Sequence, residues 1–334
     1  MGPKSLGVAL ALAMVAGCSA GDQRVTPDGS ISALVAPAGA ARTNLYVANA
    51  STVTVYAPGS DRPLRTITKV EPSSIALDSL GNLYVANLRA GTNGNVAVYR
   101  AGKSSLWWSI SKGVDNPKDL AFDAGDNLYV ANSYFDVVVY GPRKTVPSRR
   151  IKLFFPDTIA FDRKGNVYIA SESSPYGHGR AMVTVFGPKG VLLRTIVAGL
   201  NSPDALALNA DGYLFVANYG ANDVTVYAPG HTAKLRTISE GVRGPDGLKF
   251  DSRGNLYVAN NAGSTITTYA PGSPHVARTI HNGISHPTAL IFDAAGNLYV
   301  ADSNSVTEYP PGSDVPSRTI TKGVQAPIAL GFGP

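Results

Sequence analysis

Residues 245–260 read PDGLKFDSRGNLYVAN, and variants of this phrase recur along most of the chain. The Leu or Val that opens the LYVA part of each copy falls at positions 45, 83, 128, 167, 214, 256 and 298, so neighbouring copies lie 38 to 47 residues apart. A repeat of this length is typical of one four-stranded blade of a β-propeller. The spacing therefore predicts an all-β fold, a seven-bladed β-propeller of four-stranded antiparallel blades.

Each repeat divides into four short strands. A proline opens the first, as in residues 156–161, and an Asp-x-x-Gly-Asn turn leads to the LYVA strand. The Gly supplies the positive φ that a tight hairpin needs. A third strand such as 224–227 and a fourth such as 236–238 follow, both rich in Val, Thr, Ile and Tyr, which favour strands. We expect the LYVA tyrosines to pack between blades, and the arginines of the fourth strands to keep these exposed edges from pairing with other chains.

The ends of the repeat series predict how the ring closes. The first copy, at Asn44, lacks a preceding Pro-initiated strand, whereas residues 327–332 form such a strand with nothing after it. We expect the C-terminal strand to pair with the N-terminal blade, which removes the open edges. The propeller is thus expected to span residues 44–334.

The residues before the propeller predict export and lipidation. Residues 1–17 contain a positive start at Lys4 and an apolar run too short to span a membrane, as in a signal peptide. Val15-Ala16-Gly17-Cys18 resembles a lipobox, and Cys18 is the only cysteine. We expect lipidation at Cys18, a flexible tether over residues 18–43, and a lipid-anchored protein in the bacterial cell envelope, at the outer membrane if the host is Gram-negative.

Charge and composition exclude some partners. The net charge is +6, yet no Lys/Arg block is dense enough for a nucleic-acid patch, so we expect no nucleic-acid partner. The single cysteine permits no intramolecular disulfide. We expect a monomer that contacts the membrane through its anchor and binds an unidentified protein, peptide or carbohydrate.

The phrase at residues 245–260 resembles an NHL repeat, and the resemblance covers all seven units. It implies that the first strand of each blade lines the central channel. The starts of the first strands and the ends of the second strands would then share one face. The residues after the opening prolines are Ser73, Lys118, Asp157, Asp204, Asp246, Thr288 and Ile328, and those ending the second strands are Asn49, Asn87, Asn132, Ser171, Asn218, Asn260 and Asp302. We expect these residues to form a polar ring around the channel mouth.

Three consecutive blades place an aspartate at this mouth, namely Asp157, Asp204 and Asp246. Carboxylates converging in a channel suit Ca²⁺ or another divalent cation. Pro245-Asp246-Gly247 is also similar to a motif of the gluconolactonase and senescence-marker-protein family, which holds a cation there. That family has six blades, and the sequence offers no glutamate at the expected entrance. The alternative is that each Asp only bonds turn amides at the start of a strand.

Two longer loops follow the second strands on the same face, at residues 88–95 and 172–182. Function is commonly placed on the variable rim of a repeat ring. The candidate ligand-binding residues on this face are Arg89, Asn93, Lys118, Tyr176, His178, Arg180 and His286. The alternative is that the loops merely tolerate insertion.

Two functions remain open from sequence. The first is a lipid-anchored binding or interaction module, which the absence of a recognisable catalytic set favours. The second is a metal-dependent hydrolase or lyase of lactonase type, with its site at the channel mouth.

Overall fold

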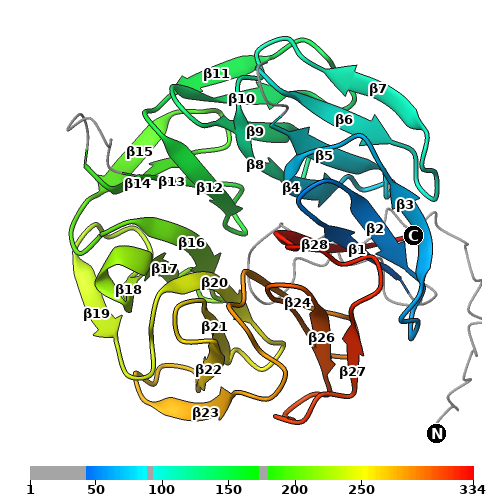
Figure 1. Cartoon of the computed structure of the whole chain (residues 1–334). Coiled ribbons are helices and arrows are strands. Elements are labelled where there is room, and N and C mark those ends of the chain that lie inside the picture. The colour runs from blue at the N-terminus through cyan, green and yellow to red at the C-terminus, as the bar shows by residue number, and fades with distance from the viewer. Residues whose placement is uncertain (1–42, 89–92, 173–179) are drawn as a thin grey trace, which may run out of the picture.

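The computed structural model describes residues 43–88, 93–172 and 180–334. Seven separate sheets of four antiparallel strands surround a central axis, as Figure 1 shows. The predicted seven-bladed β-propeller is therefore confirmed. Within the described part of the chain the only helical element is a 3-10 turn, Tyr219–Ala221, and no helix is long and apolar enough to cross a membrane.

The strands run from the channel outwards in each blade. Blade 1 consists of β28 (Ala329–Gly333), β1 (Asn44–Ala48), β2 (Val53–Tyr56) and β3 (Pro63–Ile67). Blade 2 consists of β4 (Pro72–Leu77), β5 (Leu83–Asn87), β6 (Asn95–Tyr99) and β7 (Leu106–Ile110). Blade 3 consists of β8 (Pro117–Phe122), β9 (Leu128–Asn132), β10 (Asp136–Tyr140) and β11 (Arg149–Lys152). Blade 4 consists of β12 (Pro156–Phe161), β13 (Val167–Ser171), β14 (Met182–Phe186) and β15 (Leu192–Ile196).

The remaining blades repeat the same order. Blade 5 consists of β16 (Pro203–Leu208), β17 (Leu214–Asn218), β18 (Asp223–Tyr227) and β19 (Lys234–Ile238). Blade 6 consists of β20 (Pro245–Phe250), β21 (Leu256–Asn260), β22 (Thr265–Tyr269) and β23 (Val276–Ile280). Blade 7 consists of β24 (Ala289–Phe292), β25 (Leu298–Ala301), β26 (Val306–Tyr309) and β27 (Arg318–Ile320).

The ring closes through blade 1, as the repeat register predicts. Strand β28 pairs antiparallel with β1, from Asn44 opposite Gly333 to Ala48 opposite Ala329. The Tyr46 hydroxyl also donates a hydrogen bond to the Pro334 carbonyl at 2.9 Å. In Figure 1 the C-terminus lies beside β1 and β2. Blade 1 is thus stitched together from the two ends of the propeller.

Aromatic pairs hold neighbouring blades together. The second-strand Tyr129 of blade 3 meets Phe161 on the first strand of blade 4, with ring centroids 5.0 Å apart and planes at 75°. Tyr299 and Phe332 make the same contact across the closure, at 5.2 Å and 79°. These edge-to-face geometries are favourable for aromatic rings. The interpretation of the LYVA tyrosines as packing between blades is confirmed.

The arginines of the outer strands also make hydrogen bonds to the second-strand tyrosines. Arg194 reaches across its sheet and donates to the Tyr168 hydroxyl at 2.9 Å, and Arg65, Arg149 and Arg278 bond Tyr46, Tyr129 and Tyr257 in the same way. The guanidinium therefore satisfies the polar end of the tyrosine whose ring packs between blades. In blade 2 Trp108 replaces the arginine and packs edge-on against Tyr84.

Candidate functional site

The channel mouth is built from the first residues of the inner strands. Each inner strand follows a loop from the outer strand of the preceding blade, so the residue after its proline stands at the rim of the channel. Two of these residues are used by the ring itself, because Ser73 and Thr288 donate hydrogen bonds to the carbonyls of Pro117 and Pro327 in the next blade. Four further residues of the series are charged, namely Lys118, Asp157, Asp204 and Asp246.

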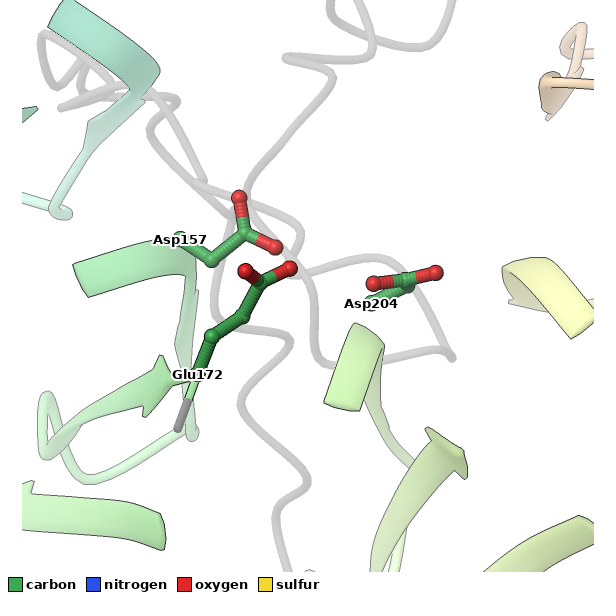
Figure 2. A group of neighbouring side chains, drawn as sticks. All are labelled: Asp157, Glu172 and Asp204. Atoms are coloured by element: carbon green, nitrogen blue, oxygen red, sulfur yellow. The ribbon is translucent and has the colours of Figure 1, made fainter. Parts of the chain in front are cut away.

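Carboxylates from consecutive blades converge at this rim. Asp157 and Glu172 belong to blade 4 and Asp204 to blade 5, and oxygens of the three side chains lie within 4.8 Å of one another. Figure 2 shows Asp157 and Glu172 side by side with Asp204 facing them. Asp246 of blade 6 lies further round the rim, where the Asn261 side-chain amide is 3.5 Å from its carboxylate. We call Asp157, Glu172, Asp204 and Asp246 the acidic mouth.

One cation accompanies these acids. The ammonium of Lys118, at the start of β8, lies 3.2 Å from Asp157 Oδ1. Burial disfavours the ammonium charge, but the pull of Asp157, Glu172 and Asp204 outweighs it, and the pKa of Lys118 is raised. A single lysine cannot neutralise four carboxylates, so the acidic mouth keeps excess negative charge if all of them ionise.

The acids respond by holding protons more tightly. Burial, followed by repulsion from Asp246, Asp157 and Glu172, raises the pKa of Asp204 to about 7. Burial also raises the pKa of Asp246 to about 6, with Lys118 opposing the shift and Asp157 adding to it. The pKa of Glu172 is raised by burial and by Asp157. Shifts of this kind are typical of sites that bind or transfer charge, because close like charges are relieved by a proton or a bound cation.

A fifth carboxylate lies next to Lys118 in the sequence of β8. Asp119 accepts hydrogen bonds from the Ser74 hydroxyl at 2.9 Å and from the Ile159 amide at 3.0 Å, which tie blades 2, 3 and 4 together. Burial raises the pKa of Asp119 to about 6, although these hydrogen bonds oppose the shift. Its full set of partners marks Asp119 as part of the scaffold beneath the acidic mouth.

The second-strand ends have a structural task instead of a ligand-facing one. Asn132 is buried, accepts a hydrogen bond from the Asp115 amide at 2.9 Å and donates one to the Gly113 carbonyl at 2.9 Å. Asn49, Asn87, Asn218 and Asn260 accept the equivalent amide bond. These asparagines pin the loops that arrive from the preceding blade. These asparagines were expected in a polar ring around the channel mouth, but they are buried, and their amides satisfy backbone groups.

The other expected ligand-binding residues that the structure describes, Asn93, Arg180 and His286, lie on three different loops. Asn93 is exposed and its carbonyl accepts from the Asn116 amide, while Arg180 is exposed just before β14. His286 is exposed on the loop into blade 7, where Nδ1 lies 3.3 Å from the Ser285 hydroxyl. Arg89, Tyr176, His178 and the lipidation candidate Cys18 lie outside the described residues.

Glu172 is the site residue that the sequence analysis missed. It directly follows β13, and its amide donates to the Phe155 carbonyl at 3.1 Å, which holds it beside the start of β12. Glu172 opens the long loop at residues 172–182 in the sequence, so no glutamate was expected at the entrance. The equivalent residue of blade 6 is Asn261, which also faces an aspartate of the mouth, so the position after the second strand was the signal.

The donor set suits a hard cation. Three carboxylates offer oxygen ligands of the kind that Ca²⁺ and Mg²⁺ prefer, and no His or Cys belongs to the group. The Lys118 ammonium would have to leave Asp157 for a metal to approach that oxygen, and its exposed side chain leaves it free to swing outwards. An incoming ammonium or guanidinium group would meet the same carboxylates.

Comparisons with known proteins place the fold and stop short of a function. No protein-family model matches the sequence. The chain is 27% identical over 118 residues to Protein STRICTOSIDINE SYNTHASE-LIKE 3 of Arabidopsis thaliana, a match that covers 30% of each protein. Among solved structures, the WD40 β-propeller domain of Doa1 superposes with a TM-score of 0.62 at 12% identity, covering 80% of this chain and 88% of that one. The chain thus shares the β-propeller fold of that domain.

Proposed function

We propose that this chain is a binding propeller whose acidic mouth captures a positively charged ligand. The observation that carries the proposal is the convergence of Asp157, Glu172 and Asp204 within 4.8 Å, with the pKa of Asp204 raised to about 7. A bound positive charge would relieve the repulsion that these groups otherwise relieve by taking up protons. Propellers commonly serve as rigid platforms for binding, with specificity set by one face.

The proposal is tested by titrating the full chain with CaCl₂ and, separately, with a hexalysine peptide in an isothermal calorimeter at low ionic strength. We expect at least one probe to bind, more tightly at pH 8 than at pH 5, because binding competes with protons on the carboxylates. The variant Glu172→Gln/Asp204→Asn should weaken that binding at least tenfold. Asp314→Asn, which removes an exposed carboxylate in the loop between β26 and β27 of blade 7, is the matched control. The proposal would be refuted if neither probe binds the native chain. It would also be refuted if the double variant binds the probe as tightly as the Asp314→Asn control.

A metal-dependent hydrolase or lyase is the second candidate, favoured by the all-oxygen donor set of the acidic mouth. The same protein samples decide it. After dialysis against Ca²⁺, this candidate requires one metal ion per chain, lost in the double variant, together with turnover of simple lactones. Binding of Ca²⁺ without turnover would retain the binding function and remove the enzymatic one.

The proposal also covers the repeat class of the propeller and its attachment to a membrane. The match between residues 245–260 and the NHL repeat supports assigning the seven blades to that repeat class. The lipobox at Cys18 supports a lipid anchor that would hold the propeller at the surface of a membrane in the cell envelope. Metabolic labelling with a fatty-acid analogue, compared between the native chain and Cys18→Ser, tests the anchor.

A further inference from the structure

An exposed group of aromatic side chains lies beside the acidic mouth. It consists of Tyr134 and Phe135, between β9 and β10, and Phe154 and Phe155, between β11 and β12. Five aromatic side chains are strongly exposed among the described residues, and three of them belong to this group, with Phe135 and Phe154 each 63% exposed. Their rings contact one another at centroid distances of 6.1 to 6.3 Å. We call these four residues the aromatic ledge, and contiguous exposed apolar surface of this kind marks interaction sites.

The ledge is kept at a conformational cost. Phe155 has a φ of 49°, in the left-handed region that bulky side chains rarely adopt. The equivalent position has a positive φ in five other blades as well, where it holds Asn116, Ser202, Gly244, His286 and Ala326. Only the asparagine and the glycine among these are residue types that readily tolerate this backbone. The backbone conformation therefore belongs to the repeat, and Phe155 is the one large apolar side chain among these six positions.

Backbone hydrogen bonds join the ledge to the acidic mouth. The Phe155 amide donates to the Tyr134 carbonyl at 3.2 Å, and the Phe155 carbonyl accepts from the Glu172 amide at 3.1 Å. Asp157 follows Phe155 by two residues, a span of roughly 7 Å in an extended chain. The apolar ledge therefore adjoins the blade 4 part of the acidic mouth, namely Asp157 and Glu172.

We propose that this surface docks an extended polypeptide segment that carries an apolar side chain and, two or three residues away, a lysine or arginine. The apolar side chain would lie on the aromatic ledge, and the basic group would enter the acidic mouth. The spacing follows from the rise of roughly 3.3 Å per residue in an extended peptide. The inference rests on the proposed cation-binding function and names the ligand class for it.

The surface chemistry favours a polypeptide over two other ligands. An anionic membrane would be repelled by the carboxylates that adjoin the ledge. The ring planes of the ledge meet at 43° to 75°, so they form no shared flat face on which a neutral sugar would stack, and such a sugar would leave the acidic mouth without a counter-charge. A basic and apolar peptide satisfies both halves of the surface.

The experiment is a selection from a phage-displayed library of random 12-residue peptides on the immobilised full chain. We expect enrichment of peptides that pair Phe, Trp, Leu or Met with Lys or Arg two or three residues apart. Enriched sequences without a basic residue, or no enrichment, would overturn the inference. Synthetic copies of the enriched peptides then serve as probes for dissociation constants by fluorescence anisotropy.

Two double variants separate the contribution of the aromatic ledge from that of the acidic mouth. Phe135→Ser/Phe154→Ser should weaken the peptides at least tenfold and leave Ca²⁺ or hexalysine binding unchanged, whereas Glu172→Gln/Asp204→Asn should weaken all of them. Leu192→Ser/Leu235→Ser, which removes two leucines that are about as exposed on the outer strands β15 and β19, is the matched control. Equal loss in the control variant would show a general effect of surface polarity and overturn the docking site.

A single substitution tests the role of the Phe155 ring. Phe155→Asn installs the residue that blade 3 has at the equivalent position. We expect an unchanged or higher melting temperature together with weaker peptide binding. A lower melting temperature with unchanged binding would show that the ring serves folding, which contradicts the inference.

Vesicles of phosphatidylethanolamine and phosphatidylglycerol provide the remaining arm, with Cys18→Ser protein to remove the anchor. Co-sedimentation that depends on Phe135 and Phe154 would overturn the inference in favour of membrane contact. If cation binding depends on Glu172 and Asp204 but no peptide is selected, the docking inference fails and the proposed function stands. If neither cation binding nor peptide binding depends on Glu172 and Asp204, the docking inference and the proposed function both fail.

Discussion

At the scale of the residue, charge repulsion sets the properties of the acidic mouth. Asp204 faces Asp157 and Glu172, and its pKa of about 7 places its titration within the physiological range. Between about pH 4 and pH 7 the folded protein therefore retains a proton that the unfolded chain has released. The free energy of unfolding should fall as the pH rises through this window and stay low above it.

Asp204→Asn should remove much of this penalty, because asparagine resembles the protonated acid and carries no charge. We expect the variant to be more stable than the native chain at pH 8, by about 2 kcal/mol after allowance for solvent screening, and nearly equal to it at pH 4. Urea unfolding at both pH values measures the difference. The control is Asp314→Asn, which should leave both values within 0.5 kcal/mol, roughly the range of surface substitutions. An Asp204→Asn variant no more stable than the native chain at pH 8 would show that the carboxylates do not repel as described.

At the scale of the element, five of the seven interfaces between blades repeat one arrangement. A second-strand aromatic packs edge-on against a phenylalanine of the next inner strand, and in most blades an arginine from the outer strand covers the tyrosine hydroxyl. Third-strand tyrosines add a second tie, as in the bond from Tyr56 to the Lys322 carbonyl at 2.6 Å. Because the same contacts recur, the interface at the closure should be as strong as an interior one.

Substituting the phenylalanine at one interior interface and at the closure tests this equivalence. Phe161→Ala and Phe332→Ala each remove a buried ring that contacts a tyrosine at 5.0 and 5.2 Å, and each should cost about 3–5 kcal/mol. Chemical denaturation of the two variants gives the comparison. A cost below 1 kcal/mol for Phe332→Ala alone would mean that β28 is only loosely attached.

At the scale of the whole molecule, the ring depends on a strand that comes from the far end of the chain. Without β28, strand β1 would keep β2 but lose its ladder partner on the channel side, and the apolar faces of β24 and β4 that β28 contacts would be exposed. Closing the ring abolishes such edges, and opening it should expose surfaces that aggregate.

Removing residues 326–334 should therefore lower the melting temperature sharply or abolish the cooperative transition. Differential scanning calorimetry of the truncated and full chains makes the comparison. A synthetic peptide of residues 325–334, added in excess, should restore part of the lost stability by occupying the vacant position beside β1. The closure would be refuted by a truncated chain that melts as hot and as cooperatively as the full one.

The repeat alone was sufficient to predict the blade number, the strand order and the closure. These features depend on local patterns, such as the Asp-x-x-Gly-Asn turns and the LYVA strands, which recur at similar spacing from Asn44 to Phe332. A tight turn and a strand are specified by neighbouring residues, so seven similar phrases predict seven similar blades.

Only the tertiary structure decided which polar residues meet. Asn132, which ends β9, was expected at the rim, yet it bonds buried backbone groups. Glu172, one residue past the end of β13, was assigned to a loop, yet it joins Asp157 and Asp204 at the mouth. The aromatic ledge likewise brings together the β9–β10 loop of blade 3 and the segment from β11 to β12 that connects blade 3 to blade 4. Contacts between blades depend on the curvature of the closed ring and on side-chain direction, and neither is encoded in the residues next to each group in the chain.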